Sequence, residues 1–213
     1  MLGQKLNPWL RKVPVWLVYL AGFVPLAVMA YGIGQLYAGK PYAGLGADPL
    51  ASLEHQTGIW ALRFLIAALV VTPLLRITRI SLIKFRRAIG LLGFYYAMAH
   101  LMVWVWLDHQ FAWGALWQEI VKRPYITIGM VAFVILVPLA VTSNNLAVRR
   151  MKSATWKRIH WWAYLATALG SVHFVLVVKA WPPEPLIYAS IVAVLLGWRA
   201  MGPLKKRRRV VAV

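Results

Sequence analysis

Long apolar runs alternate with short, mostly basic polar segments along almost the whole chain. A helix that crosses a membrane needs about 20 mostly apolar residues, and the pattern predicts six of them. The predicted spans cover residues 13–31, 58–75, 88–107, 125–141, 159–178 and 185–201, of which the last has the shortest uninterrupted apolar run. We therefore expect an all-α integral membrane protein, a bundle of six transmembrane helices.

The first apolar run follows Lys5, Arg11 and Lys12, as the core of a signal peptide would. It is longer than the usual signal-peptide core of about 7–15 residues, and no clear A-x-A cleavage site follows it. We expect it to be retained as the first span. No internal repeat or low-complexity segment is visible, so residues 1–213 are predicted to form a single domain that ends in a short basic cytoplasmic tail at 202–213.

The composition agrees with a membrane protein, since 62% of the residues are hydrophobic and 14% are charged, against about 25% charged in soluble domains. A net charge of +19 first suggests a nucleic-acid-binding protein. The basic residues lie between apolar runs and not along one polar face, so we expect membrane lipid and no nucleic acid as partner. The absence of cysteine excludes disulfides, iron–sulfur clusters, thiolate zinc sites and covalently attached c-type heme.

Most of the 24 Lys and Arg residues lie in four segments: the N-terminus, the loop after the second span, the loop after the fourth span, and the tail. The loops between these segments hold few. Because cytoplasmic loops carry the excess of Lys and Arg, both termini are predicted to be cytoplasmic and the number of spans even. The tail is expected to lie on anionic lipid.

Two histidines lie deep inside predicted spans, His100 in the third and His173 in the fifth. Both spans run from the cytoplasm outward, and at about 1.5 Å per residue each histidine lies roughly 20 Å above the inner boundary. Ionisable residues are costly inside a membrane and are often functional. Two imidazoles at one depth can bind one heme iron from both faces, because a porphyrin leaves two axial positions. Hydrogen bonds between helices are the alternative.

Small residues precede both histidines at helical spacing. They are Gly90, Gly93 and Ala97 before His100, and Ala166 and Gly170 before His173. They make room for a flat cofactor, or they simply let membrane helices pack closely.

His160 lies at the inner edge of the fifth span, and on a straight helix its side chain points about 140° away from that of His173. One heme cannot bind both, so His160 is a candidate ligand of a second, inner heme. In the third span Arg87, not a histidine, lies at that depth. The partner of His160 is therefore unidentified, and an ordinary interfacial histidine is the alternative.

Apart from Arg199 at the inner end of the last span, Arg63 is the one Lys or Arg inside a predicted span, about one turn from the outer boundary. It is a candidate partner for a heme propionate, or it extends to the nearby headgroups. His55 and His109 lie near the outer ends of spans and are predicted to be ordinary interfacial residues.

The chain contains no G-x-G-x-x-G, P-loop, H-E-x-x-H or G-x-S-x-G motif, and hence no visible nicotinamide-binding or hydrolytic site. If electrons pass through this protein, a quinol or a separate reductase must deliver them, and another protein must perform the final chemistry.

Several loop motifs point to a known family. They are GLGADP at 44–49, EHQTG at 54–58, VTPL at 71–74, KRPYITIG at 122–129 and PLIY at 185–188. Together with the histidines of the third and fifth spans, this combination resembles the MsrQ family over nearly the whole chain. MsrQ is the heme-binding membrane subunit of the MsrPQ methionine sulfoxide reductase system of Gram-negative bacteria.

The resemblance implies a ferric-reductase-like transmembrane domain in the inner membrane that binds heme b, and FMN is also attributed to the family. Such a subunit is not itself catalytic. It passes electrons from the quinone pool or a cytosolic flavin reductase to a periplasmic molybdopterin-containing partner, MsrP, which repairs oxidised envelope proteins. The family's heme-associated histidines map onto His100, His160 and His173. Larger relatives carry a second histidine on the third span, which this chain lacks, and no residue can be named for FMN.

Two other functions compete with this reading. One is a stand-alone metalloreductase that reduces ferric or cupric ions at the outer face. The other is a cofactor-free transporter or assembly protein, although the internal repeats common in transporters are not visible. The outer loops around Asp48 and Lys122, the longest exterior segments, are the expected docking surface for a partner.

Overall fold

The computed structural model describes residues 2–40, 44–178 and 182–210, with backbone alone for Leu2, Gln4 and residues 202–210, and every regular element in these ranges is helical. Residues 211–213 of the predicted tail lie outside the described ranges. The elements are α1 (Leu2–Lys12), α2 (Trp16–Tyr37), α3 (Pro49–Thr78), the 3-10 helix η1 (Ile83–Phe85), α4 (Arg86–Met102), the π-helix η2 (Val103–Asp108), α5 (Trp113–Lys122), α6 (Pro124–Val141), α7 (Asn145–Arg150), α8 (Ser153–Val177) and α9 (Pro183–Val210). The predicted all-α fold is confirmed.

Five helices within the described ranges are long and apolar enough to cross a membrane. They are Trp16–Tyr37, Pro49–Thr78, Ile83–Asp108, Pro124–Val141 and Pro183–Met201. The predicted fifth span does form a helix, α8, and its 25 residues are long enough. Its two histidines, three tryptophans and basic first turns lower its mean hydropathy, so it does not join the five. The multi-pass architecture is confirmed, whereas the count of six is not.

Helix α3 begins at Pro49, well before the predicted start at residue 58. Asp48 caps it, because its Oδ1 accepts a hydrogen bond of 3.0 Å from the Ala51 N–H. Pro49 follows at the first helical position, where its missing N–H costs nothing. The extra turns place Glu54 and His55 on a helix and not in a loop.

Helix α1 was not predicted, because it is too short and too polar to span a membrane. It packs on the connection between α3 and α4, where the Asn7 side chain donates to the Arg79 carbonyl and accepts from the Ser81 N–H, both at 2.9 Å. Lys84 Nζ donates 2.8 Å to the Val13 carbonyl at the end of α1. These polar contacts fix α1 across one end of the bundle.

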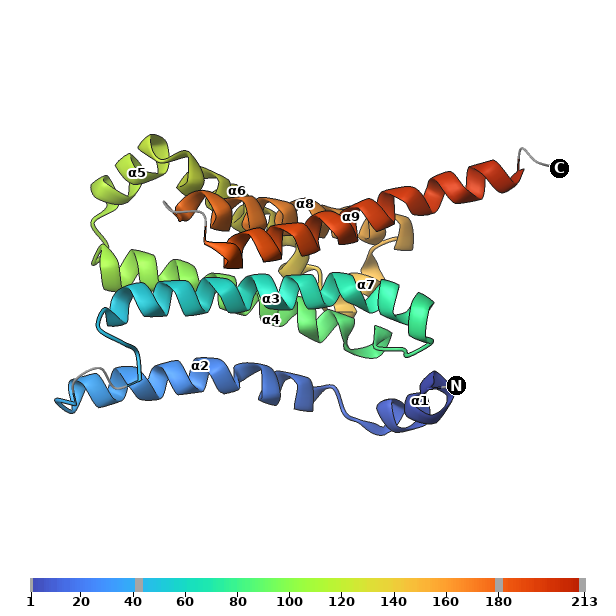
Figure 1. Cartoon of the computed structure of the whole chain (residues 1–213), viewed down its shortest axis with the longest axis horizontal. Helices are drawn as coiled ribbons and strands as arrows, with labels where there is room; N and C mark the ends of the chain where they lie inside the picture. Colours follow the sequence, from blue (N-terminus) through green and yellow to red (C-terminus); the bar gives the residue numbers. More distant parts are fainter. Residues whose placement is uncertain (1, 41–43, 179–181, 211–213) are drawn as a thin grey trace.

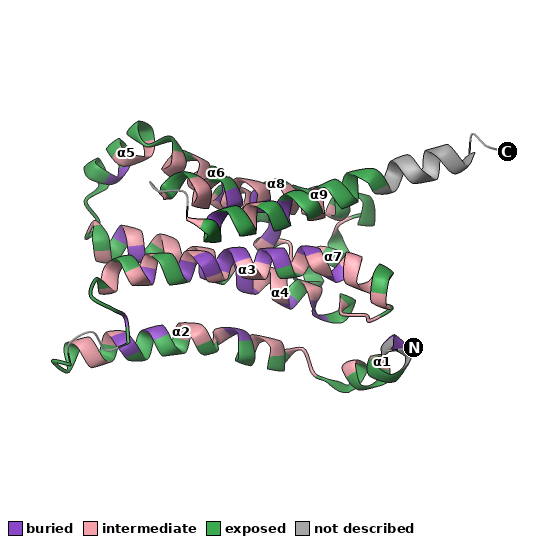
Figure 2. Cartoon of the chain, viewed as in Figure 1, coloured by how far each residue is buried: buried purple, intermediate pink, exposed green. Residues whose placement is uncertain are grey.

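The long helices run along one common direction (Figure 1). Helix α3 packs along α4, α6 along α8, α9 against α8, and α2 against α4. Helix α5 lies at one end of the bundle, which we call the α5 end, whereas α1 and the last turns of α9 lie at the other. Burial concentrates on α3 and α4, whereas much of α2 and α9 is exposed (Figure 2), including large apolar residues such as Leu20, Val28 and Val194.

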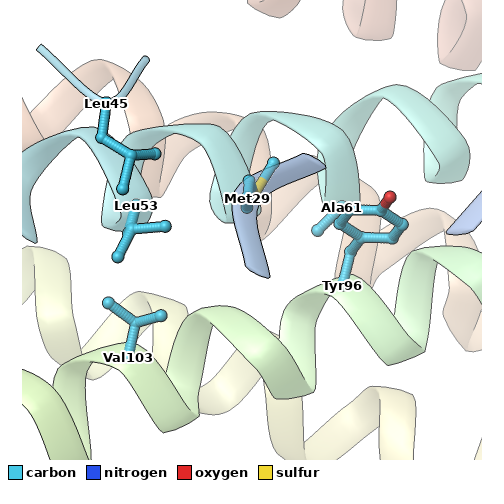
Figure 3. Close-up of a cluster of buried hydrophobic side chains, with 6 residues drawn as sticks. All are labelled: Met29, Leu45, Leu53, Ala61, Tyr96 and Val103. Carbon is cyan, nitrogen blue, oxygen red and sulfur yellow. The ribbon is translucent and has the colours of Figure 1, made fainter. Parts of the chain in front are cut away.

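A buried cluster joins α2 to α3 and α4 (Figure 3). It contains Met29, Leu45, Leu53, Ala61, Tyr96 and Val103. The buried Tyr96 hydroxyl donates to the Gly22 carbonyl at 2.7 Å and accepts from the Leu26 N–H at 3.0 Å. A Cβ on Gly22 would lie only 2.3 Å from Leu92 Cδ1, so α2 approaches α4 closely because Gly22 lacks a side chain.

Candidate cofactor-binding site

A cavity of about 730 Å³ lies between α3, α4, α6 and α8 and reaches the α5 end of the bundle. Much of its wall is apolar, from side chains such as Ile59, Leu62, Leu65, Phe133 and Leu136. Its volume falls within the roughly 300–1,000 Å³ usual for cofactor and small-molecule sites.

His100 of α4 and His173 of α8 both face this cavity. Their ring centroids are 6.2 Å apart and the ring planes are inclined by 73°. A metal–imidazole bond of about 2 Å, plus about 1 Å from nitrogen to ring centre, places two axial imidazoles of one metal about 6 Å apart. The observed spacing therefore fits one metal ion between the two rings.

Backbone carbonyls orient both rings. His100 Nδ1 lies 2.9 Å from the Glu54 carbonyl and 3.4 Å from Thr57 Oγ1, and His173 Nδ1 lies 2.7 Å from the Tyr125 carbonyl. A carbonyl only accepts, so in each ring Nδ1 carries the proton and donates it. The lone pair is then on Nε2, the arrangement that metal-binding histidines usually have.

Two glycines let the neighbouring helices press against these rings. A Cβ added to Gly58 of α3 would lie 3.2 Å from His100 Nδ1, and one added to Gly129 of α6 would lie 2.8 Å from His173 Nδ1. Both glycines close motifs that carry the family resemblance, but the sequence alone did not show what they contact. Of the small residues singled out from the sequence, Ala97, Ala166 and Gly170 line the cavity.

A porphyrin fits this set of donors. Among the described residues, no group of three or more His, Asp or Glu side chains could hold a metal ion by itself. A metal bound between His100 and His173 would therefore need most of its ligands from elsewhere, and a porphyrin supplies four in one plane. The apolar wall and the small residues beside the histidines suit such a flat, mostly apolar group.

His160 lies outside the cavity, toward the α7 end of α8. Its Nε2 is 3.2 Å from Ser143 Oγ, and its Nδ1 is 3.1 Å from the Trp156 carbonyl, so both nitrogens already have protein partners. The ring also stacks on Trp156 at a centroid distance of 3.8 Å. The structure thus does not bring His160 together with His100 and His173.

Arg63 and Arg87 also lie outside the cavity wall. Arg63 Nε donates 2.8 Å to the Tyr188 hydroxyl, and its guanidinium lies over the Trp60 ring at 5.0 Å. Arg87 is exposed, and its Nη1 donates 2.7 Å to Asn145 Oδ1 of α7. In this structure both arginines join helices to one another.

Charged side chains gather where the cavity reaches the α5 end. His109 lies between two carboxylates, with Nδ1 3.0 Å from Asp108 and Nε2 3.4 Å from Glu119, and Glu119 in turn pairs with Arg123 at 2.9 Å. The Tyr125 hydroxyl accepts from Arg123 at 3.0 Å and is the main cause of the raised pKa of this guanidinium. All five side chains line the cavity, with Asp108 and Arg123 exposed and the other three partly buried. The sequence did not single out Arg123 as a site residue.

His55 also lines the cavity, and its Nε2 lies 3.6 Å from Glu184 of α9. Glu54, whose carbonyl orients His100, also lines the same cavity. Its Oε1 is buried and has no hydrogen-bond partner among the described residues. The early start of α3 is what brings these two side chains to the cavity.

Comparison with known proteins agrees with this architecture. The family model described as "Ferric reductase like transmembrane component" matches residues 57–171, a stretch that contains His100 and His160 and ends two residues before His173. A protein of Brucella ovis is 47% identical over 206 residues, which cover 97% of this chain and 90% of that protein. One of Brucella anthropi is 46% identical over 198 residues, which cover 93% and 86%.

Both relatives are named "Protein-methionine-sulfoxide reductase heme-binding subunit MsrQ". Identity at this level over nearly the full length of both sequences leaves the family in no doubt. The chain belongs to the MsrQ family and carries its ferric-reductase-like transmembrane component.

Proposed function

We propose that this protein is the membrane electron-transfer subunit of a methionine sulfoxide reductase system and carries electrons through heme b. The observation that carries the proposal is the pair of imidazoles, His100 and His173, whose centroids lie 6.2 Å apart across one cavity. The names of the relatives give the heme and the reductase independently of that geometry. His100 and His173 are the residues that would hold the iron.

Heme supplies a one-electron carrier that cycles between ferric and ferrous iron. The chain's own residues hold it and set its surroundings. The Glu54 and Tyr125 carbonyls keep each imidazole protonated on Nδ1, so that Nε2 stays available. Apolar side chains such as Leu62, Leu65 and Leu136 exclude water from the cavity wall.

We further propose that α8 also crosses the membrane, as the fifth of six spans, and that residues 1–213 form one domain with both termini in the cytoplasm. At about 1.5 Å per residue, the 25 residues of α8 are long enough to cross the hydrocarbon core. Helix α8 packs between α6 and α9, which are apolar enough to span on their own. The basic segments near α1 and α7 lie opposite the α5 end, as the positive-inside rule requires of a cytoplasmic face.

Electrons are proposed to come from the quinone pool or a flavin reductase and to leave to a periplasmic, molybdopterin-containing catalytic subunit of the MsrP type. The setting is the bacterial inner membrane, and the task is repair of oxidised envelope proteins. The cavity reaches the α5 end, the periplasmic end in the proposed orientation, and this supports a proposed exit for electrons near the loops around Asp48 and Lys122. FMN rests on the family resemblance alone.

His160 is kept as a candidate ligand of a second iron. To ligate through Nε2 it would have to give up its contact with Ser143. By residue count Arg87 of α4 lies at about the depth of His160, so we retain it as a candidate for binding an anionic cofactor group there.

The experiment is an absorbance spectrum of the purified full-length protein in detergent, with pyridine-hemochrome quantification. We expect a Soret band that shifts on reduction by dithionite, and loss of most heme in His100→Ala and in His173→Ala. His55→Ala, a histidine on the same cavity wall without a proposed ligand role, is the matched control and should keep its heme. Full heme content in both ligand variants would refute the assignment.

A stand-alone metalloreductase is the second candidate, favoured by one observation. Three of the chain's five Asp and Glu residues, Glu54, Asp108 and Glu119, line the cavity near the α5 end, where they would attract cations. Reduction of ferric or cupric salts by the purified, pre-reduced protein without any soluble partner would support it. Electron transfer to an MsrP-type partner in preference to metal salts would support the first function instead.

A further inference from the structure

Arg123 is the one Lys or Arg among the described residues that line the cavity. Heme b carries two propionates, and a carboxylate held partly out of water needs a cationic or hydrogen-bonding partner. The cation that the sequence suggested for this task, Arg63, contacts Tyr188 and Trp60 and does not reach the cavity wall.

The local structure makes Arg123 suitable for binding an anion. It lies at the N-cap of α6, directly before Pro124, where the helix carries a partial positive charge. Its Nη1 donates to the Tyr125 hydroxyl and its Nη2 pairs with Glu119, both at about 3 Å. A guanidinium has five N–H donors, so these two contacts leave donors for a further acceptor.

Arg123 is also close in the chain to the proposed iron ligand. Two residues after it, the Tyr125 carbonyl accepts the hydrogen bond from His173 Nδ1. One short backbone segment therefore both orients an imidazole and presents a cation at the mouth of the same cavity.

We propose that Arg123 binds a propionate of the heme at the α5 end of the cavity, in place of Arg63. This inference rests on the proposed function, because it requires heme between His100 and His173. Glu119 competes for the same guanidinium in the structure. Removing Arg123 should therefore weaken heme binding, and removing the charge of Glu119 should strengthen it.

The test uses the full-length holoprotein in nanodiscs and measures the rate at which heme passes to excess apomyoglobin. Arg123→Gln should release heme about tenfold faster, the size expected for a charge-assisted hydrogen bond. Two controls should release heme at the wild-type rate: Lys122→Gln removes a neighbouring charge that does not line the cavity, and Arg63→Gln tests the competing assignment. Wild-type release from Arg123→Gln, or faster release from Arg63→Gln alone, would overturn the proposal.

Heme dimethyl ester, which has no propionate charge, serves as the second probe. Wild-type protein reconstituted with the ester should lose it about tenfold faster than heme, whereas Arg123→Gln should lose both at similar rates. Glu119→Gln should retain heme longer than wild type but leave the ester unaffected. An equal preference for heme over the ester in wild type and Arg123→Gln would refute the pairing, even if the variant is less stable.

The two proposals fail in different ways. If His100→Ala and His173→Ala keep their heme, the proposed site is wrong whatever Arg123 does. If those variants lose heme, the proposed heme site is supported. If, in addition, Arg123→Gln prefers heme over the ester as strongly as wild type does, only the assignment of Arg123 to a propionate is wrong. A fall in the midpoint potential of Arg123→Gln, because the lost cation no longer favours the ferrous form, gives a readout independent of heme release.

Discussion

Replacing Gly129 by Ala would put a Cβ 2.8 Å from His173 Nδ1 and 2.9 Å from its Cε1. Comfortable contacts between such atoms begin at about 3.5 Å, so the ring or the α6 backbone must move by roughly 0.7 Å. The hydrogen bond from His173 Nδ1 to the Tyr125 carbonyl is 2.7 Å long. A shift of that size takes it to or past the usual upper limit of about 3.2 Å.

The expected loss of heme affinity follows from the role of that hydrogen bond in orienting the His173 ring. Loss of the group that orients a ligating histidine typically lowers metal affinity by about 10- to 100-fold, and functional side chains must stay within about 0.5 Å of their productive positions. We therefore expect Gly129→Ala to weaken heme retention by about 10- to 100-fold. Gly58→Ala, whose Cβ would lie 3.2 Å from His100 Nδ1, needs a movement about half as large and should have a smaller effect.

The assay compares heme content after purification, the rate of heme transfer to apomyoglobin, and the low-spin ferric EPR signal, which responds to axial imidazole orientation. Gly90→Ala is the matched control, because its Cβ meets nothing within 4 Å and alanine is favoured over glycine in helices by about 1 kcal/mol. Gly129→Ala protein that holds heme as firmly as Gly90→Ala, with an unchanged EPR signal, would refute the reasoning.

Three further predictions concern the frame around the site and are checked by thermal unfolding of the purified protein in detergent. Asp48→Ala should destabilise the protein by about 1 kcal/mol by removing the cap of α3, whereas Asp48→Asn, which keeps an oxygen acceptor, should stay near wild type. Gly22→Ala should cost about 1–3 kcal/mol because its Cβ would overlap Leu92 at 2.3 Å, and adding Leu92→Ala should recover part of that loss; no recovery would contradict the overlap. Tyr96→Phe should cost about 1 kcal/mol through loss of its two backbone hydrogen bonds to α2, and the exposed Tyr95→Phe should cost almost nothing.

The helices that cross a membrane could be predicted from the sequence because hydropathy is a local property. Where the prediction went astray, a specific side chain was responsible. Asp48 and Pro49 start α3 early, and an N-cap is a single polar residue with no effect on average hydropathy. Helix α8 is long enough to cross a membrane, but His160 and His173 lower its mean hydropathy, and by hydropathy it is not among the five candidate spans. The two histidines that make α8 a candidate functional helix are thus among the residues that lower its mean hydropathy.

The candidate site also contains residues that the sequence identified and residues that only the structure revealed. The depths of His100 and His173 follow from counting residues along two helices, and the structure brings both rings to one cavity. Arg63, at a plausible depth, nevertheless contacts Tyr188 on α9 instead of the cavity, and Arg123 was overlooked because it lies in a loop motif. Depth is readable from sequence, but the rotation of a helix about its own axis is not.

By itself, then, the sequence determined a helical membrane protein with histidines at matched levels and a family resemblance over most of the chain. Only the tertiary structure decided which carbonyls orient the two imidazoles, why Gly58 and Gly129 must be glycine, and which arginine reaches the cavity. The physical reason is the distance along the chain over which each property is determined. Hydropathy and helix rise act between neighbours in the chain, whereas a hydrogen bond from His100 to the Glu54 carbonyl depends on how α3 and α4 pack against each other.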